Sequence, residues 1–470
     1  MNDLDRLTRR QLLRKGLGAA ASVGALSALP RIPSMAADDE RKPNIVFVFA
    51  DQLRYSAVGC LGDRQVITPN MGKLASQGMS LTNAISGFPV CTPYRASLLT
   101  GRYGQSTGVV KNNIPVPDTR NSFPRILKKS GYDTGYIGKW HLNGNVANPP
   151  YVPRERRLGF DYWVTNLHRH YDVVCCFGDD PEPRLMPGYL PDVQTDLAIN
   201  YINDHKDRPF FLCVSWMPPH TPNTPPELFR KMYHPGDLKL PPNVHEDHRD
   251  YIAAYYGLVT SLDYNLGRLM NALAEAGIDD NTILVFTSDH GDLLGAHWQG
   301  IDSHKQKPWE ESIHVPFIVR YPGMIRPGSR CNVLLNSVDV MPTLLGLAEA
   351  PVPSIVDGMD LSSSLLGRGG KEPESALLQV IMRSGGEPVP DVWRGVRTKR
   401  YTYARFREEG WVLYDNQEDP YQLNNLIDKP EAKGIKDNLE AELRTLLKKT
   451  GDDFASEEEW NLRVRTARAL

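Results

Sequence analysis

Three apolar runs of this chain each end in residues that can bind a metal ion or transfer a proton. All three runs are rich in β-branched and aromatic residues, a pattern that is typical of strands buried on both faces of a sheet. The runs 44–50, 210–216 and 282–287 lead into Asp51-Gln52, His220 and Asp289-His290. Any fold of this chain must therefore cover these strands on both sides and accommodate polar residues where they end.

Helical patterns separate the apolar runs. The segment 251–276 carries apolar residues at helical spacing, Gly277 follows as a helix-terminating residue, and the run 315–320 adds a fourth strand. Strands that alternate with helices predict an α/β fold with a mostly parallel central sheet between layers of helices. Ligands of such sheets bind beyond the carboxyl ends of the strands, so the polar residues named above are expected to meet there.

The C-terminal part has a different pattern. Short alternating runs at 394–398, 401–405 and 411–414 predict a small antiparallel sheet, and apolar residues on one face of 438–449 predict a helix. A glycine-rich stretch, 367–370, precedes these runs, so we place a boundary near residue 375. The predicted organisation is an N-terminal segment 1–36, a main domain 37–375 and a C-terminal α+β subdomain 376–470.

Residues 1–36 are predicted to be an export signal and not part of the fold. Arg9 and Arg10 precede a weakly apolar run, 17–29, and Ser34-Met35-Ala36 supplies small residues for cleavage. The paired arginines resemble the twin-arginine signal, which implies transfer of the folded protein by that export machinery to the periplasm or the outside. The apolar run is shorter than the ~18–20 residues that span a bilayer, so no stable membrane anchor is expected. A basic amphipathic helix is the alternative interpretation.

The composition excludes several classes of protein. With 41% hydrophobic residues, the chain can build a large core and is not disordered. Its 54 Lys and Arg against 56 Asp and Glu leave no overall positive charge, so no nucleic-acid partner is expected. Six cysteines in 470 residues do not make a disulfide scaffold. The adjacent Cys175 and Cys176 are not expected to pair with each other, and Cys213 is expected to be buried.

The stretch 91–102, Cys-Thr-Pro-Tyr-Arg-Ala-Ser-Leu-Leu-Thr-Gly-Arg, carries the most specific signal. A cysteine near an arginine is by itself usually structural. This stretch, however, strongly resembles the type I sulfatase motif, in which Cys-x-Pro-x-Arg is followed by a leucine pair and Thr-Gly-Arg. Members of that family have an alkaline-phosphatase-like fold, and a maturation enzyme oxidises their motif cysteine to formylglycine, an aldehyde. The resemblance implies conversion of Cys91, with Arg95 orienting the hydrated aldehyde.

The chemistry of a sulfatase explains why an unmodified side chain is not enough. A serine or cysteine that attacks sulfur leaves a stable ester on the enzyme. A hydrated aldehyde has two hydroxyls on one carbon, so one can attack while deprotonation of the other expels sulfate and regenerates the aldehyde.

Further residues match other motifs of the family. The resemblance implies that Lys139 stabilises the charged intermediate and that His141 takes the proton that releases sulfate. It implies that His220 is the general acid for the leaving group and that Lys305 contacts the sulfate oxygens, with Lys307 as the competing lysine. Without the resemblance, the two histidines would be read as a core imidazole and as part of a rigid proline-rich loop.

A divalent metal ion is expected where the strands end. The ligands are expected to be Asp51, Gln52, Asp289 and His290, together with the converted Cys91. Oxygen-rich donors suit a hard cation, and Ca²⁺ is the expected ion. Many sulfatases have Asp-Asp and Asp-Asn where this chain has Asp-Gln and Asp-His, and the imidazole nitrogen makes Mn²⁺ the alternative, as in the related phosphonate monoester hydrolases.

The residues that bind the rest of the substrate are less defined. His168 and His170 lie in a predicted loop and are candidates for binding a sugar hydroxyl, a carboxylate or a second sulfate. A solvated surface loop is an equal alternative for this segment. Arg54 and His297 are weaker candidates of the same kind.

These features predict an exported sulfuric ester hydrolase that acts on a sulfated carbohydrate and releases inorganic sulfate. The choice of carbohydrate is an association with export and not a physical deduction. Two alternatives stay open at this point. One is a phosphonate or phosphate mono- or diester hydrolase with the same formylglycine chemistry, and the other is a non-catalytic sugar-binding relative in which Cys91 is never converted.

Overall fold

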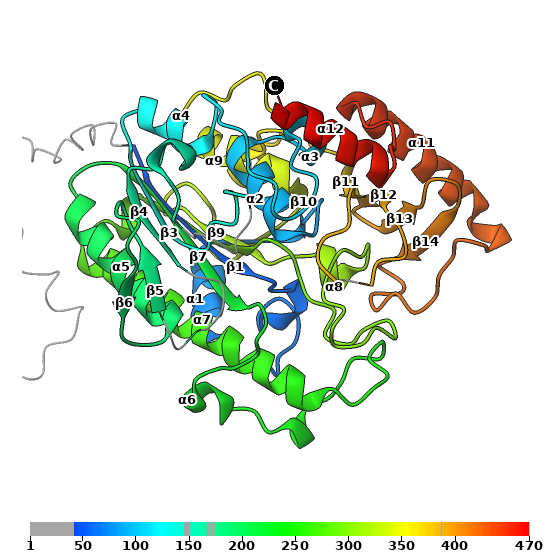
Figure 1. The fold of residues 1–470 in the computed structure, drawn as a ribbon. Coiled ribbons are helices and arrows are strands. Elements are labelled where there is room, and N and C mark those ends of the chain that lie inside the picture. Colours follow the sequence, from blue (N-terminus) through cyan, green and yellow to red (C-terminus); the bar gives the residue numbers. More distant parts are fainter. Residues whose placement is uncertain (1–41, 145–150, 167–170, 172–173, 387, 470) are drawn as a thin grey trace, which may run out of the picture. The chain divides into compact units, whose positions relative to one another are not determined.

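The computed structural model describes residues 42–144, 151–166, 171, 174–386 and 388–469. Among these residues, ten strands form one sheet in the order β10-β2-β9-β8-β1-β7-β3-β4-β5-β6 (Figure 1). The strands are β1 (Asn44–Asp51), β2 (Met79–Ile85), β3 (Asp133–Gly138), β4 (Tyr162–Asn166), β5 (Val174–Phe177), β6 (Arg184–Met186), β7 (Phe210–Pro219), β8 (Thr282–Ser288), β9 (Phe317–Arg320) and β10 (Ser329–Asn336).

This sheet is mostly parallel, which confirms the predicted α/β fold. The central neighbours β8, β1, β7 and β3 all run in the same direction. β9 is antiparallel to both β2 and β8, and β5 is antiparallel to β4 and β6. The run 315–320 therefore does form a strand, but its direction is the reverse of that of its neighbours.

Helices cover both faces of the sheet. On one face lie α1, α5 and α7, and on the other lie α2, α4 and α9 (Figure 1). The helices are α1 (Pro69–Gln77), α2 (Cys91–Thr100), α3 (Gly104–Thr107), α4 (Phe123–Lys129), α5 (Leu190–His205), α6 (Glu227–Arg230), α7 (Arg249–Glu275), α8 (Glu310–Ile313), α9 (Val340–Leu347), α10 (Ser362–Leu365), α11 (Lys433–Thr450) and α12 (Glu457–Ala469).

β1 shows why its sequence is apolar throughout. Alternate side chains of a strand point to opposite faces, and here both faces meet helices. Ile45, Phe47 and Phe49 pack into the core on one side of the sheet, and Val46 and Val48 pack into the core on the other. The unbroken apolar run is thus the sequence of a strand that water does not reach.

The C-terminal part forms a separate four-stranded antiparallel sheet, as predicted. Its strands are β11 (Ser375–Val380), β12 (Trp393–Thr398), β13 (Tyr401–Arg405) and β14 (Gly410–Asp415), in that spatial order. One face packs on α11 through Leu439 and Leu443, and residues of the other face join the core of the large sheet. The sheet begins at Ser375, although the division of the chain into domains at that point stays a prediction.

The predicted export signal lies outside the described residues. Within the described ranges, no helix combines the length and the apolar character needed to cross a membrane. All six cysteines are described and are free, and Cys213 is 1% exposed, as its apolar surroundings predict.

Candidate active site

The four central strands bring the predicted site residues to one edge of the sheet. Because β8, β1, β7 and β3 are parallel neighbours, their carboxyl ends lie side by side. Asp51 is the last residue of β1, Lys139 directly follows β3, His220 directly follows β7, and Asp289 and His290 directly follow β8. Residues that are more than 200 positions apart in the sequence therefore converge here.

The chain leaves two of these strands with unusual backbone geometry. Gln52 and His141 have positive φ angles of 75° and 58°, which residues other than glycine seldom adopt. Gly138 is needed for a different reason: a Cβ there would lie 2.0 Å from the backbone oxygen of Ser215 in β7. The close packing of β3 against β7 fixes where β3 ends. The turns at Gln52 and His141 then change the direction of the chain at this edge of the sheet.

Cys91 lies at the centre of this group. It is the first residue of α2 and is 1% exposed. Its Sγ lies 3.3 Å from Lys305 Nζ, 3.3 Å from His290 Nε2, 3.7 Å from Asp51 Oδ1 and 3.8 Å from Lys139 Nζ. Burial and Asp51 raise the pKa of the thiol, but Lys139, Lys305 and His290 outweigh them and bring it down to about 6. The surroundings of Cys91 therefore favour negative charge.

Arg95, one turn further along α2, holds the strand ends together. Its Nη2 lies 3.0 Å from Asp51 Oδ2 and 3.0 Å from Asp289 Oδ2, and its Nη1 donates to Lys139 O and Ser215 Oγ, both at 2.7 Å. Burial lowers the pKa of Arg95, but the two carboxylates raise it by more, so the guanidinium stays charged. Its role toward a hydrated aldehyde stays a prediction, since these contacts position the carboxylates and the Lys139 backbone.

Four side chains at this edge form a possible metal site. Ligand atoms of Asp51, Cys91, Asp289 and His290 all lie within 4.8 Å of one another, and all four residues are buried. Burial and the adjacent Asp51 raise the pKa of Asp289 to about 6, because two carboxylates repel each other where water is excluded. A divalent cation relieves this repulsion, so the donor set fits a hard metal ion.

The geometry of His290 suits a ligand. Its Nδ1 lies 2.9 Å from the carbonyl oxygen of Gly291. A carbonyl only accepts hydrogen bonds, so Nδ1 carries the proton and Nε2, which faces Cys91, has a lone pair available for a cation.

Gln52 uses its side chain differently from the two carboxylates. Its Oε1 accepts a hydrogen bond from Lys305 Nζ at 3.0 Å, and its Nε2 donates to Asp292 Oδ2 at 2.7 Å. Its backbone N–H donates to Asp289 Oδ1 at 3.1 Å. Gln52 thus orients a lysine and a carboxylate of the site, and its assignment as a metal ligand stays a prediction.

The two competing lysines have distinct places. Lys305 Nζ lies 3.3 Å from Cys91 Sγ and 3.5 Å from His220 Nε2. Lys307 Nζ instead donates to Ser303 Oγ at 3.2 Å and to the carbonyl of Pro388 at 2.9 Å. The structure therefore brings Lys305 to Cys91 and turns Lys307 toward the C-terminal part.

Residue 306 connects this lysine loop to the C-terminal part. Gln306 Nε2 donates to Ser384 O at 2.7 Å, Ser384 N donates to Gln306 Oε1 at 2.9 Å, and Trp393 Nε1 donates to Gln306 O at 2.9 Å. Sequence reasoning missed Ser384 and Trp393, because no local pattern relates them to a loop about 80 residues earlier.

The two candidate histidines are half-buried near cations. His220 Nδ1 lies 2.8 Å from Thr221 O, and its carbonyl accepts a hydrogen bond from the hydroxyl of Tyr171. The carbonyl of His141 accepts from Thr92 Oγ1, next to Cys91, at 3.0 Å. Burial lowers the pKa of both imidazoles well below the usual value, and Lys139 is the next contributor in each case. Both are therefore neutral at pH 7.

The structure describes only two of the remaining candidates, Arg54 and His297. His168 and His170 lie outside the described residues. His297 Nε2 pairs with Glu311 Oε2 at 3.0 Å, and Arg54 Nη1 donates to Leu293 O at 3.3 Å. Arg54 thus binds the segment that follows Asp289, and His297, within that segment, binds α8.

Comparison with known proteins covers both sheets. The Sulfatase family model matches residues 43–350, and the model for the C-terminal part of N-sulphoglucosamine sulphohydrolase matches residues 303–449. An ulvan-active sulfatase from Formosa agariphila is 39% identical over 431 residues, which cover 89% of this chain and 84% of that protein. An endo-4-O-sulfatase from Bacteroides thetaiotaomicron is 30% identical over 495 residues, 91% of this chain and 96% of that protein.

A solved structure from Bacteroides fragilis, whose own sulfatase assignment is a prediction, is 33% identical with a TM-score of 0.79. The alignment covers 88% of this chain and 97% of that one. The similarity thus extends over both the large sheet and the C-terminal sheet. Since the family model and these relatives span most of its length, the chain belongs to the sulfatase family and is a sulfuric ester hydrolase.

Proposed function

We propose that this protein hydrolyses sulfate esters of a carbohydrate through a formylglycine formed at Cys91. The observation that carries the proposal is the convergence of Lys139 and Lys305 on the Sγ of this buried residue, at 3.8 and 3.3 Å. Two ammonium groups around one small side chain stabilise a group with several negatively charged oxygens, as a sulfate ester has. The oxidation of Cys91 requires a separate maturation enzyme as a partner.

His220 is the proposed general acid of the first half-reaction. One hydroxyl of the hydrated aldehyde would bond to sulfur and give up its proton to Asp289, whose carboxylate lies within 4.8 Å of Cys91 Sγ. The bond from sulfur to the sugar oxygen would break, and His220 would give that oxygen a proton. Lys139 and Lys305 contribute to the low pKa of His220 in the free protein. The negative charge of a bound sulfate offsets these cations, so substrate binding raises the pKa of His220 and favours the acid form.

His141 is the proposed base of the second half-reaction. It takes the proton of the second hydroxyl, the carbon–oxygen bond to the sulfate breaks, and the aldehyde forms again. Water then restores the hydrate. Burial and Lys139 keep the pKa of His141 low, so a neutral imidazole is available to accept this proton near pH 7.

Asp51, Asp289, His290 and the oxygen of the converted residue 91 are proposed to hold a divalent cation, with Gln52 as a further ligand. Ca²⁺ is the proposed ion and Mn²⁺ the alternative. Such an ion, when bound, polarises a sulfate oxygen and orients the ester. Arg95 keeps both carboxylates in place through its paired contacts.

The proposed substrate is a sulfated polysaccharide or its fragments. The F. agariphila relative is described as ulvan-active, and the B. thetaiotaomicron relative is named for removal of a 4-O-sulfate. Export through a twin-arginine signal in residues 1–36 would place the enzyme in the periplasm or outside, where such polymers occur. The phosphonate or phosphate ester alternative is not favoured, because the family model and these relatives are named for sulfatase activity.

Conversion of Cys91 and turnover can be tested on the same preparation. The full chain, produced together with a formylglycine-generating enzyme, is expected to release inorganic sulfate from ulvan or another sulfated polysaccharide. It is also expected to turn over an aryl sulfate faster than the matched aryl phosphonate. Mass spectrometry of the peptide that contains Cys91 is expected to show the aldehyde.

The control for this experiment is a second buried cysteine. Cys91→Ala is expected to abolish turnover and keep the fold, whereas Cys213→Ala, in β7, is expected to keep both activity and the aldehyde. Substantial activity of Cys91→Ala, or an active enzyme whose Cys91 is an intact thiol, would refute the proposal. Faster turnover of the phosphonate would overturn the choice of sulfate.

A further inference from the structure

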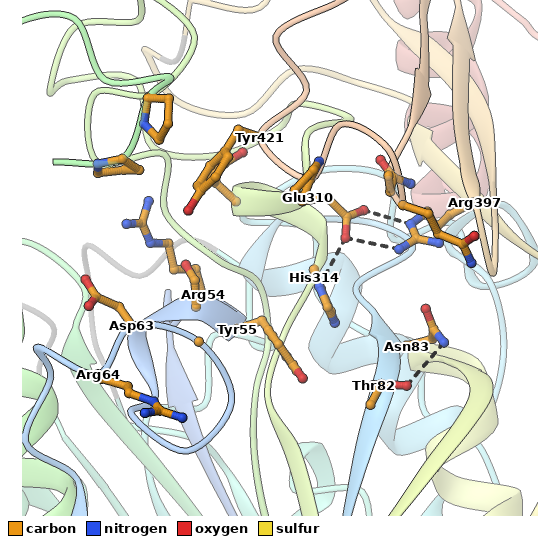
Figure 2. A pocket seen from close by; sticks show the side chains of 18 of the residues that line it. Arg54, Tyr55, Asp63, Arg64, Thr82, Asn83, Glu310, His314, Arg397 and Tyr421 are labelled. Atoms are coloured by element: carbon orange, nitrogen blue, oxygen red, sulfur yellow. Dashed lines mark hydrogen bonds and ion pairs between the residues drawn. The ribbon is translucent and has the colours of Figure 1, made fainter.

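A cavity of about 820 Å³ lies beside the C-terminal sheet (Figure 2). Its lining comes from the segments 54–65 and 239–242, from β2 and β10, from α8, and from residues between 397 and 421. The residues around Cys91 are not part of this lining. Nothing in the proposed mechanism uses this cavity.

The cavity lies close to the proposed metal site. Arg54 and Glu311 line the cavity, and Gly291, which follows His290, packs against their other side. A Cβ on Gly291 would lie 1.9 Å from the backbone oxygen of Glu311 and 2.9 Å from the Cβ of Arg54. No side chain fits there, so Arg54 and Glu311, which line the cavity, pack closely against the residue next to His290.

The two glutamates of the cavity already have partners. Glu310 pairs with Arg397 at 2.7 Å, a contact drawn in Figure 2, and Glu311 pairs with His297 at 3.0 Å. The other cations that line the cavity are Arg54, Arg64, Lys239 and Lys399. Of these, Arg64, Lys239 and Lys399 are exposed. Lys399 also pairs with Glu372 at 3.0 Å, and Asp63 is a third carboxylate of the lining. The lining thus has five Arg and Lys side chains against three carboxylates, which leaves an excess of positive charge.

Arg54 and Arg397 are the buried cations among the described residues of this lining, and Arg397 pairs with Glu310. Arg54 is 4% exposed, and its Nε has no hydrogen-bond partner among the residues that the structure describes. An arginine guanidinium keeps its positive charge in proteins. A buried guanidinium with an unused donor, on the same side of the cavity as Arg64 (Figure 2), is suited to bind an anion.

The uncharged lining is suited to a sugar. Amide side chains, which donate and accept hydrogen bonds, match hydroxyl groups, and aromatic rings pack on the faces of sugar rings. Tyr55 is stacked on His314 with 3.8 Å between ring centroids, and Tyr421 is 43% exposed. The amides are those of Gln65, Asn83, Asn332, Asn416 and Gln417.

We propose that this cavity binds a second anionic sugar unit, one that carries a sulfate ester or a carboxylate, from the polymer that the enzyme processes. The identity of that polymer rests on the proposed function, whereas the cavity itself does not depend on Cys91. A sugar held there keeps the polymer attached while another unit reacts. This attachment raises the effective concentration of sulfate esters at Cys91.

Binding can be measured on the full chain with Cys91→Ala, which prevents turnover. The probe is a chondroitin 4-sulfate octasaccharide, compared by calorimetry with its desulfated form, a neutral cello-oligosaccharide and inorganic sulfate. Adding Arg64→Ala and Lys399→Ala is expected to weaken octasaccharide binding by about tenfold or more. The matched control, Arg326→Ala with Lys433→Ala, removes exposed cations elsewhere on the chain and is expected to leave binding unchanged.

The probes separate the possible anions. Loss of binding on desulfation assigns the cavity to a sulfate ester, and retention of binding assigns it to the carboxylate. Equal binding of the neutral oligosaccharide, equal binding of inorganic sulfate alone, no binding of the octasaccharide, or equal effects of the two double variants would each overturn the proposal.

Turnover distinguishes this site from the active site. In the converted enzyme without Cys91→Ala, Arg64→Ala with Lys399→Ala is expected to raise KM for a sulfated polymer and leave kcat/KM for a small aryl sulfate unchanged. Failure of the unmutated enzyme to hydrolyse any sulfate ester would refute the proposed function but leave the binding result standing. A parallel loss on the aryl sulfate would instead show that the cavity merely supports the active site.

Discussion

Lys305 and Lys307 lie two positions apart and serve different parts of the molecule. The backbone between them turns at Gln306, whose φ is 65°, so the two ammonium groups have different partners. Lys305 contacts Cys91 and Gln52, whereas Lys307 contacts Ser303 and the backbone of Pro388. Lys305 is thus part of the group around Cys91, whereas Lys307 connects its own loop to the C-terminal part.

Substitution of each lysine should separate these roles. Lys305→Ala is expected to lower kcat/KM for an aryl sulfate by about 10²–10³-fold, because it removes a charge that stabilises the sulfate oxygens in the transition state. Lys307→Ala is expected to lower the unfolding midpoint and to keep kcat near that of the unmutated enzyme when measured well below that midpoint. Equal losses of kcat/KM in the two variants would contradict the assignment of Lys305.

His220→Ala should show its effect through the leaving group. An alkyl or sugar oxygen needs a proton as it leaves, whereas an aryl oxygen needs much less. The loss of kcat/KM is therefore expected to be about 10²–10⁴-fold for a sugar sulfate and clearly smaller for an aryl sulfate. Kinetics on a series of esters with leaving groups of different pKa would measure this, and equal losses across the series would remove the general-acid role.

At the scale of single elements, α8 is a short helix with two half-buried acidic side chains. Glu310 pairs with Arg397 of β12 and with His314, while Glu311 pairs with His297 and accepts a hydrogen bond from Asn243. Burial raises the pKa of Glu310, but Arg397 and His314 lower it by more, so it is held well below the usual range. A four-residue helix thus connects the large sheet to the C-terminal sheet electrostatically.

Glu310→Gln is expected to lower the free energy of unfolding by about 3 kcal/mol at pH 7, because it leaves Arg397 buried without its charge partner. The pKa of Glu310 is lower in the folded than in the unfolded state. Its contribution is therefore present above the unfolded value of about 4.3 and is lost as the pH falls below it. Urea denaturation of both proteins at pH 7 and at about pH 3.5 should show the difference shrinking at the lower pH.

The control for this prediction is an exposed ion pair. Glu227→Gln breaks the contact between Glu227 and Lys231 on α6, in which both side chains are about 70% exposed. It is expected to change the free energy of unfolding by less than about 1 kcal/mol. A difference between Glu310→Gln and the unmutated protein that stayed constant with pH would contradict the charge argument.

The elements that the sequence could predict are those with a strong local pattern. The runs 44–50, 210–216 and 282–287 correspond to β1, β7 and β8, and the segment 251–276 corresponds to α7. Their local pattern sufficed because the spacing of apolar residues within each segment identifies it as a buried strand or as a helix with one buried face. The direction of β9 was not readable, because pairing direction depends on which strands lie beside it and not on its own residues.

The candidate site was predictable to a similar extent. The residues at the strand ends followed from parallel strands sharing an edge, and Cys91, Lys139 and Lys305 followed from motif resemblance. The contacts of Gln306 with Ser384 and Trp393 were not predictable, because they depend on packing between segments about 80 residues apart. The cavity beside the C-terminal sheet was not predictable for the same reason, since several separate segments line it.

At the scale of the whole molecule, the two sheets share one core. Leu378, Val380 and Trp393 of the C-terminal sheet belong to the same apolar cluster as Met341 and Leu344 of α9. The small sheet therefore completes the core of the large one and is more than an appendage. The boundary near residue 375 marks a change of architecture within this shared core.

Deletion of residues 376–470 is therefore expected to prevent cooperative folding of the rest. The truncated chain would expose the side of the core that the small sheet covers. It would also lose the hydrogen bonds of Ser384 and Trp393 to Gln306, which lies between the two lysines. Calorimetry is expected to show no sharp unfolding transition, and a dye that binds exposed apolar surface is expected to bind strongly. A chain that lacks only residues 1–36 is the control and is expected to unfold sharply. A sharp transition in the truncated chain would show that the main domain is independent.

The burial of Cys91 limits when its side chain can be modified by another enzyme. A side chain that is 1% exposed at the start of an internal helix is out of reach for another enzyme once the chain has folded. If Cys91 is converted to an aldehyde as proposed, the conversion would therefore take place before the chain has folded. If residues 1–36 are the twin-arginine signal that the sequence predicts, the chain would be exported already folded, and a molecule that lacked the proposed modification would be exported inactive.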